Sequence, residues 1–272
     1  MKKLIILLLV LMMAVFSVNA AETGNTATTT TKTFNEKGGD TLTIKAYKKK
    51  KTGKQDLTIK VIDALTGSLD DIFESNNTDI KVINIDNYVD KFLGSTSDTT
   101  GLRKKAIFSI HAGGNIKGDV SVKVTFSPLT YYTLKTAADT EGTFLTIKDE
   151  KGNNVTYKKG DKVIKVKYFM QDINYYFTSA GASVATDSSS QTEKIELTGA
   201  TTANVEVSSS SGEQSLAFSW KVTPGDSSSL TTENYWDVEA MFAMIIDSNT
   251  YNDNKTDGTY IAPITISITY GS

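Results

Sequence analysis

Apolar and polar residues alternate along many short segments of this chain, which is the period of strands that bury one face. In residues 120–126 and 264–270, Val, Ile, Phe or Tyr alternates with Ser, Thr or Lys. Further strands are predicted at residues 41–47, 56–62, 80–85, 163–170 and 235–246. Polar turns separate these segments, so the pattern predicts an all-β protein with antiparallel sheets. The lysine-rich stretch between residues 41–47 and 56–62 predicts a hairpin with a basic loop.

Two short segments break the alternation. Residues 68–75 and 87–94 place Leu, Ile and Phe at helical spacing, and Ser68 and Asn87 are residues that cap helices. Both are short, so little helix is expected.

An internal similarity suggests that one module occurs twice. The matched pairs are residues 42–45 with 145–148, 106–110 with 240–244, and 114–126 with 258–270. Their order along the chain is conserved, as expected for two copies that diverged by loop insertion. We therefore predict two tandem immunoglobulin-like antiparallel β-sandwich domains, at residues 34–130 and 131–272.

The N-terminal residues have the pattern of an export signal. Lys2 and Lys3 precede an unbroken apolar run, and small or compact residues follow it, so a signal peptide is expected at residues 1–20. The run is too short to span a bilayer, which needs about 20 apolar residues, so membrane insertion is not expected. Residues 21–33 are rich in Thr and poor in large apolar groups, which predicts a flexible tail. The mature protein is expected at the cell surface, in the periplasm or outside the cell.

Composition narrows the function classes. The chain has a formal net charge of −2, and loss of Lys2 and Lys3 with the leader makes it more acidic. Nucleic acid is therefore not an expected partner, because a chain with a net negative charge is repelled by the phosphate backbone. The chain has no cysteine, so it has no disulfide framework and no thiolate chemistry. No cofactor is expected, and stability must come from core burial.

Few residues are suited to catalysis. His111 is the only histidine, so it cannot build a multi-histidine metal site, and we expect it to be an ordinary residue at a loop edge. Asp237 and Glu239 fall on one face of a predicted strand, and glycoside hydrolases use such a carboxylate pair. Acidic residues also occupy the solvent face of ordinary antiparallel sheets. We therefore expect no catalytic residues and no enzymatic activity.

Residues 247–258 crowd together the side-chain oxygens that calcium prefers. The candidate ligands are Asp247, Asn249, Asp253 and Asp257. Their order differs from an EF-hand, and Asn and Asp are equally typical of hairpin loops. We favour a loop over a metal site.

Basic and aromatic residues are the candidates for surface contacts, although four adjacent lysines are also typical of a loop that is simply soluble, and we favour that interpretation over contact with an acidic glycan. The candidate ligand-binding residues are Lys48, Lys49, Lys50, Lys51, Tyr131, Tyr132, Tyr175 and Tyr176. Adjacent aromatic residues on a strand point to opposite faces, so half of each pair is expected in the core.

The end of the chain resembles a known family. The segment GTYIAPITISITYGS, an alternating strand after Gly-x-Tyr, is similar to the C-terminal strand of bacterial fimbrial subunits and related exported immunoglobulin-like surface proteins. The resemblance implies an adhesive or fibre-forming role, although the fimbrial cysteine pair is absent. Pro263 within this strand predicts an edge or bulge position.

These patterns together predict a non-catalytic, exported structural or adhesive protein. Its expected partners are a glycan or a cell-surface protein, and a pilus-like homopolymer is a further hypothesis. The alternative is a carbohydrate-binding or carbohydrate-active β-sandwich that uses Asp237 and Glu239.

Overall fold

In a computed structural model, the strands that the structure describes form two sheets. The structure describes residues 25–28, 40–49, 57–67, 69–71, 81–114, 116, 118–148, 153–179, 182–184, 194–223, 235–254 and 259–270. The expected signal peptide at residues 1–20 lies outside the described residues.

The first sheet is built around the C-terminal strand. Among the described residues it contains ten strands, and its main path runs β10-β11-β9-β18-β8-β16-β14, with β2, β5 and β1 on the other side of β18. The bounds are β1 (Asn25–Thr28), β2 (Asp40–Lys49), β5 (Lys81–Asn84), β8 (Gly118–Phe126), β9 (Leu129–Leu134), β10 (Phe144–Lys148), β11 (Asn154–Ile164), β14 (Lys194–Thr198), β16 (Gln214–Thr223) and β18 (Thr259–Tyr270). Only the β2–β18 pair is parallel among the described pairs of this sheet.

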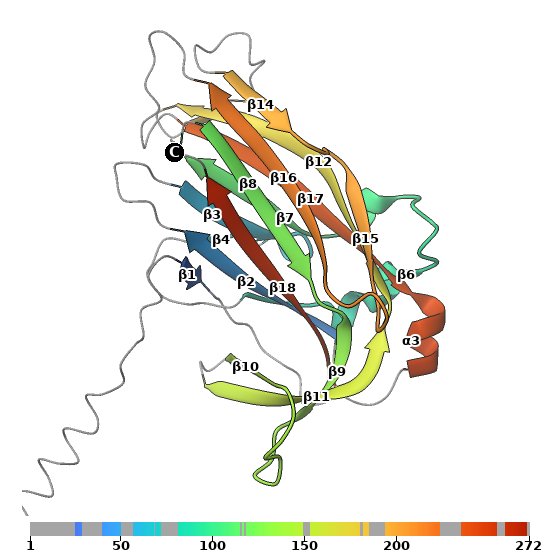
Figure 1. The fold of residues 1–272 in the computed structure, drawn as a ribbon. Helices are drawn as coiled ribbons and strands as arrows, with labels where there is room; N and C mark the ends of the chain where they lie inside the picture. The colour runs from blue at the N-terminus through green and yellow to red at the C-terminus, as the bar shows by residue number, and fades with distance from the viewer. Residues whose placement is uncertain are drawn as a thin grey trace, which may run out of the picture.

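The second sheet faces the first (Figure 1). Its eight described strands follow the path β13-β12-β17-β7-β3-β4, with β15 also on β12 and β6 on β17. The bounds are β3 (Leu57–Asp63), β4 (Leu69–Asp71), β6 (Leu93–Gly94), β7 (Ala106–Gly114), β12 (Val166–Ser179), β13 (Ala182–Val184), β15 (Ala203–Val207) and β17 (Tyr235–Asp247).

One hydrophobic core fills the space between the sheets. It joins Val122 and Ile266 of the first sheet to Phe108 and Phe242 of the second, all of them fully buried. Every second residue of β8 and β18 contributes to this core, as the alternating pattern predicts. The all-β prediction with antiparallel sheets is therefore confirmed.

The expected division into tandem sandwiches at residue 130 does not hold for the described strands. Strand β8 from the first half and β18 from the second half pair directly, with Phe126 opposite Ile264 and Val120 opposite Tyr270. Residue 130 lies inside β9, and strands from both halves contribute to both sheets. The two halves thus share one interior.

The internal similarity has a simpler cause than duplication. Residues 106–110 and 240–244 lie on β7 and β17, which are also adjacent antiparallel strands, with Phe108 opposite Phe242. Neighbouring strands that bury the same face against the same core acquire the same alternation of residue types. Two of the three matched pairs are therefore neighbours within a sheet, whereas residues 42–45 and 145–148 lie on β2 and β10, which do not pair with each other.

The expected hairpin over residues 41–62 is also wrong. Strand β2 pairs with β1, β5 and β18 in the first sheet, whereas β3 pairs with β4 and β7 in the second. Strands β2 and β3 therefore lie in different sheets and do not form a hairpin.

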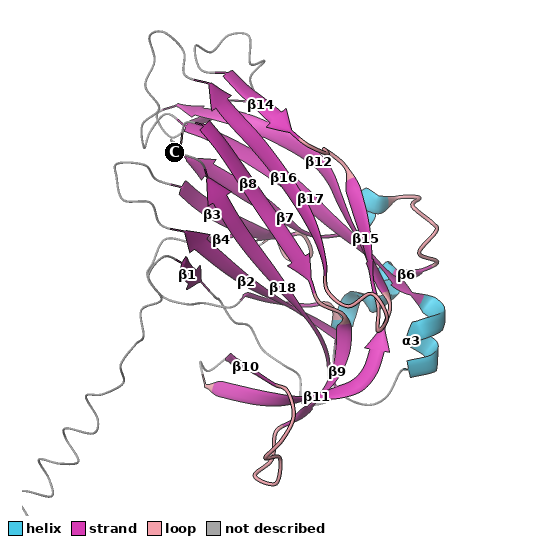
Figure 2. Cartoon of the chain, viewed as in Figure 1, coloured by secondary structure: helices cyan, strands magenta, loops and turns pink. Residues whose placement is uncertain are grey.

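Helices are few and short in the described part of the chain (Figure 2). They are the 3₁₀ helices η1 (Asp86–Tyr88) and η2 (Leu102–Lys105) and the α-helices α2 (Val89–Phe92) and α3 (Ser248–Asn254). Helix α2 confirms the prediction at residues 87–94 in part, and β4 replaces part of the helix expected at residues 68–75. None of the described helices is long and apolar enough to cross a membrane.

The expected tail and the expected edge strand both differ from the structure. Residues Asn25–Thr28 of the predicted tail form β1 and pair with the end of β2. Strand β18 is hydrogen-bonded on both sides, to β2 on one and to β8 and β9 on the other. Pro263 was expected at a sheet edge or at a bulge, and the structure places it opposite a bulge within the sheet.

Candidate functional site

A bulge divides one long strand of the first sheet into β8 and β9. Phe126 of β8 lies opposite Ile264, and Thr130 of β9 lies opposite Ile261. Between these two pairs, the β8–β9 strand therefore has one residue more than β18. Pro263 faces the bulge and has no N–H to donate, so the regular ladder cannot continue there. Its carbonyl accepts one hydrogen bond, from the N–H of Ser127 at 2.9 Å.

The sheet splits at this bulge. Strand β16 follows β8 as far as the Gln214–Phe126 pair, whereas β11 follows β9 from the Ile164–Leu129 pair onward. Both strands flank the same edge of the β8–β9 strand, and they diverge where it bulges. Figure 1 shows β10 and β11 projecting from this end of the sandwich.

A second irregularity shapes β11 opposite Tyr131. The pairing of β11 with β9 shifts between Lys159 and Val163, and Gly160 lies in the shifted segment. A Cβ atom on Gly160 would lie 2.8 Å from Cδ1 and 3.2 Å from the carbonyl oxygen of Tyr131. Only glycine permits this close approach of the two strands.

The β10–β11 hairpin is held by its own contacts. Tyr132, Ile147, Tyr157 and Ile261 form a small buried cluster outside the main core. In the loop before β10, Asp139 accepts hydrogen bonds from Lys158 Nζ at 2.6 Å and from Thr136. Lys158, followed by Thr136, holds the pKa of Asp139 well below its ordinary value. The hairpin is thus anchored at both its strands and its loop.

A pocket of about 620 Å³, open to solvent on one side, lies at the split. Its lining residues are Ser127, Pro128, Thr130, Tyr132, Thr143, Phe144, Leu145, Lys159, Gly160, Asp161, Val163, Ser209, Gly212, Glu213, Pro263 and Thr265. This volume is within the range of about 300 to 1,000 Å³ typical of small-molecule sites.

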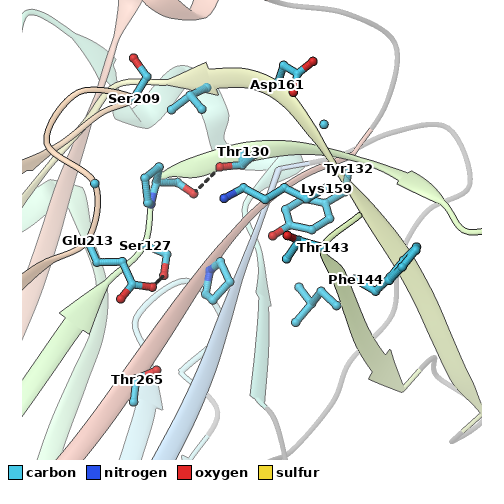
Figure 3. A pocket seen from close by; sticks show the side chains of 16 residues that line it. Ser127, Thr130, Tyr132, Thr143, Phe144, Lys159, Asp161, Ser209, Glu213 and Thr265 are labelled. Atoms are coloured by element: carbon cyan, nitrogen blue, oxygen red, sulfur yellow. Dashed lines mark hydrogen bonds between the residues drawn. The ribbon is translucent and has the colours of Figure 1, made fainter. Parts of the chain in front are cut away.

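The pocket combines apolar surfaces with hydroxyl and charged groups (Figure 3). Lys159 lies in the middle of the labelled side chains, with Glu213 and Ser127 on one side and Phe144 on the other. The Ser127 hydroxyl donates to Oε1 of Glu213 at 2.7 Å. Tyr132 is only 6% exposed, and burial raises the pKa of its phenol.

A second polar cluster lies on the outer face of the second sheet. Glu239 of β17 is directly opposite His111 of β7, and Asp237 lies two residues away on the same face. Nδ1 of His111 is 3.3 Å from Oδ2 of Asp237, and Nε2 is 3.3 Å from Oε1 of Glu239. Tyr176 of β12 donates to Oε2 of Glu239 at 3.4 Å. The imidazole is therefore clamped between two carboxylates, and we call this the His111 clamp.

The clamp is mostly shielded from solvent. The side chains of His111, Asp237 and Glu239 are 17%, 23% and 19% exposed. Burial alone would lower the pKa of His111, but the hydrogen bond to Asp237 and the charges of both carboxylates outweigh it and raise the pKa to about 9. His111 in turn lowers the pKa of Glu239. Near neutral pH the clamp is thus an imidazolium between two carboxylates.

The structure confirms one part of the catalytic analysis and corrects another. Asp237 and Glu239 do share one face of a strand. His111 is not at a loop edge, because it lies inside β7 and is half-buried. None of these three residues lines the pocket.

The calcium candidates that the structure describes lie at or within a helix, not in the expected loop. Residues 248–254 are helix α3, and Asp247 caps it by accepting hydrogen bonds from the N–H of Thr250, at 2.8 Å, and from its hydroxyl. Burial alone would raise the pKa of Asp247, but the hydrogen bonds from Thr250 hold it below its ordinary value. Asn249 and Asp253 lie within this helix, and Asp257 is outside the described residues. No metal-binding group of His, Cys, Asp or Glu occurs among the residues that the structure describes.

The predicted ligand-binding residues are not brought together. Tyr131 packs against Tyr260, with 5.5 Å between ring centroids, and Tyr175 packs against Trp236 at 5.9 Å. Tyr132 lines the pocket, whereas Tyr176 belongs to the His111 clamp on the other sheet. The prediction that half of each pair faces the core holds for Tyr175 and Tyr176, but not for the other pair, because Tyr131 packs against the main core and Tyr132 is buried in the small cluster. Lys48 and Lys49 end β2, and Lys50 and Lys51 lie outside the described residues.

Most of the pocket residues were not among the candidates predicted from the sequence. Lys159, Glu213 and Phe144 come from three separate segments, and no local motif connects them. The visible signals were Pro128 and Pro263 inside or beside predicted strands, because proline interrupts a ladder.

Comparison with protein-family models, curated proteins and solved structures gave no match. The fold and the pocket therefore define the class: an all-β sandwich with a ligand-sized pocket at a split sheet.

Proposed function

We propose that this chain is a non-catalytic binding protein, exported to the cell surface, periplasm or extracellular space, that holds a glycan in the split-sheet pocket. The observation that carries the proposal is the pocket itself, in which apolar rings lie beside hydroxyl and charged side chains. A sugar ring has an apolar face of C–H groups and an edge of hydroxyls, so it needs both kinds of surface.

The pocket provides both surfaces. Phe144, Tyr132 and Pro263 provide apolar contact area, and Thr143 and Glu213 provide hydrogen-bonding groups. The hydroxyls of a sugar can donate to the carboxylate of Glu213, which accepts one hydrogen bond from Ser127. The anchored hairpin favours a preformed wall, which reduces the entropic cost of binding.

The N-terminal leader pattern supports export in this proposal. The resemblance of residues 258–272 to fimbrial and immunoglobulin-like surface proteins supports an adhesive role. A pilus-like polymer is not part of the proposal, because β18 is already paired on both sides.

The observations disfavour a carbohydrate-active enzyme that uses Asp237 and Glu239. Such an enzyme needs a general acid whose pKa is raised, whereas His111 lowers the pKa of Glu239. Both carboxylates are also paired with His111, which suits a structural role on the sheet face.

Binding of purified protein to a glycan panel, followed by calorimetry on the bound compounds, tests the proposal. Thr143 is exposed at the pocket, so Thr143→Trp should fill the pocket without disturbing the core. Thr133→Trp is the matched control, because Thr133 is an exposed β9 residue outside the pocket lining. We expect Thr143→Trp to weaken glycan binding at least about tenfold and the control to leave it unchanged. Absence of glycan binding, or equal binding by Thr143→Trp, would refute the proposal.

A further inference from the structure

Lys159 is placed differently from the other lysines near the pocket. Lys158 pairs with Asp139, and Lys135 lies over the ring of Phe144, with Nζ 5.1 Å from the ring centroid. The ammonium group of Lys159 contacts no hydrogen-bonding or charged partner among the described residues, although it lies in the middle of the pocket side chains (Figure 3).

The backbone holds Lys159 in this place. Its N–H donates to the carbonyl of Thr143 at 2.9 Å, and Gly160 next to it packs against Tyr131. The side chain therefore starts from a fixed position at the β11 bulge. A charged donor without a partner in a pocket is well placed to bind an oxyanion of a ligand.

The opposite side of the pocket carries a charge of the other sign. Glu213 lies across from Lys159 and accepts a hydrogen bond from Ser127. A ligand that suits both groups has an oxyanion at one end and hydroxyl donors at the other. A neutral sugar satisfies Glu213 but leaves the ammonium group of Lys159 without a charged partner.

Resting on the proposed function, we infer that the pocket selects acidic sugars, with Lys159 binding the carboxylate of a uronic acid residue and Glu213 accepting its hydroxyls. Lys159 is thus a specificity-determining residue. The pocket is open to solvent at this lysine, so the contact is weakened by salt.

Calorimetry with trigalacturonic acid and with its methyl ester tests the inference, because esterification removes the negative charge of each carboxyl group and adds only a methyl group to it. We expect the acid to bind about ten- to a hundredfold more tightly than the ester, and Lys159→Gln to abolish this preference. Lys162→Gln is the matched control, because Lys162 is exposed on the same bulge but does not line the pocket. It should retain the preference.

The outcomes separate the two proposals. If the acid and the ester bind equally and Lys159→Gln changes neither, the selectivity for acidic sugars is wrong although the glycan pocket remains. If a sulfated disaccharide binds in a Lys159-dependent way and trigalacturonic acid does not, the assignment to a uronic acid is wrong. If none of the probes or panel glycans binds, the proposed function itself fails.

Discussion

The ring of Phe126 on β8 stacks on the ring of Tyr168 on β12, with 4.1 Å between ring centroids and 17° between ring planes. Phe126 also lies 6.0 Å from the ring of Phe242 on β17. These contacts cross the interior from the first sheet to the second and join residues that are far apart in the chain. They place residues from both halves of the sequence in one core.

Replacing Phe126 with alanine should destabilise the whole protein. Phe126 is completely buried, and removing a buried phenylalanine ring costs about 3 to 5 kcal/mol of unfolding free energy. Chemical denaturation followed by tryptophan fluorescence measures this loss. Thr125→Ala is the control, because Thr125 is only half-buried and shares one hydrogen bond with Ser215. A loss for Phe126→Ala no greater than that for the control would contradict the packing described here.

Residues 34–130 and 131–272, produced as separate polypeptides, should both fail to fold. Each would lack the strands that complete its sheets, since β8 requires β18 and β7 requires β17. An unpaired strand edge and half a core cannot offset the entropy of ordering the chain. Amide NMR spectra of the two polypeptides should therefore be poorly dispersed. A well-dispersed spectrum from either one alone would restore the tandem-domain hypothesis.

The His111 clamp should make stability fall as pH rises. The pKa of His111 is raised from 6.5 to about 9, so the folded state binds its proton more tightly than the unfolded state. This stabilisation is fully present below pH 6.5 and is lost as pH rises through 9. A shift of this size corresponds to about 3 kcal/mol as an order of magnitude. Urea denaturation at pH values from 6 to 9.5 measures it.

The variant His111→Gln isolates this effect. It removes the titrating group but leaves Asp237 and Glu239 close together, so the variant should be less stable than the parent near neutral pH. The variant keeps Tyr176 of β12 and Lys60 of β3, two other titratable residues beside the clamp. If the variant shows the same alkaline loss of stability as the parent, another group causes that loss.

Gly160→Ala should displace the β11 wall of the pocket. The added Cβ would lie 2.8 Å from Tyr131, so β11 must move or the ring must turn, at a cost of about 1 to 3 kcal/mol. Gly94→Ala is a suitable control, because its new Cβ would meet only the flexible end of Lys105 at 3.3 Å and Ile245 at 3.6 Å. Thermal denaturation and glycan calorimetry of both variants measure the effect. Unchanged stability and binding in Gly160→Ala would show that the close approach at Tyr131 is not required.

Local pattern was sufficient to identify several strands. The alternation in residues 120–126, 264–270 and 235–246 corresponds to β8, β18 and β17, and the predicted inward residues are buried apart from the half-buried Tyr270. The same pattern misled the domain prediction, because similar alternation arises in strands that lie side by side. The site was predictable only in part: Tyr132 was a candidate, but Lys159 and Glu213 reach the pocket only through the bulges that split the sheet.

The sequence by itself determined which segments are strands and which of their faces lies inward, because the alternation of side chains is set within each strand. Only the tertiary structure decided that β8 lies beside β18, that His111 falls between two carboxylates, and that a pocket opens beside Pro263. Those features depend on which distant strands pair and in which register. Many strands have nearly equal patterns, so the pattern of a single segment does not determine its partner. The partners are determined by how all the strands pack around one shared core.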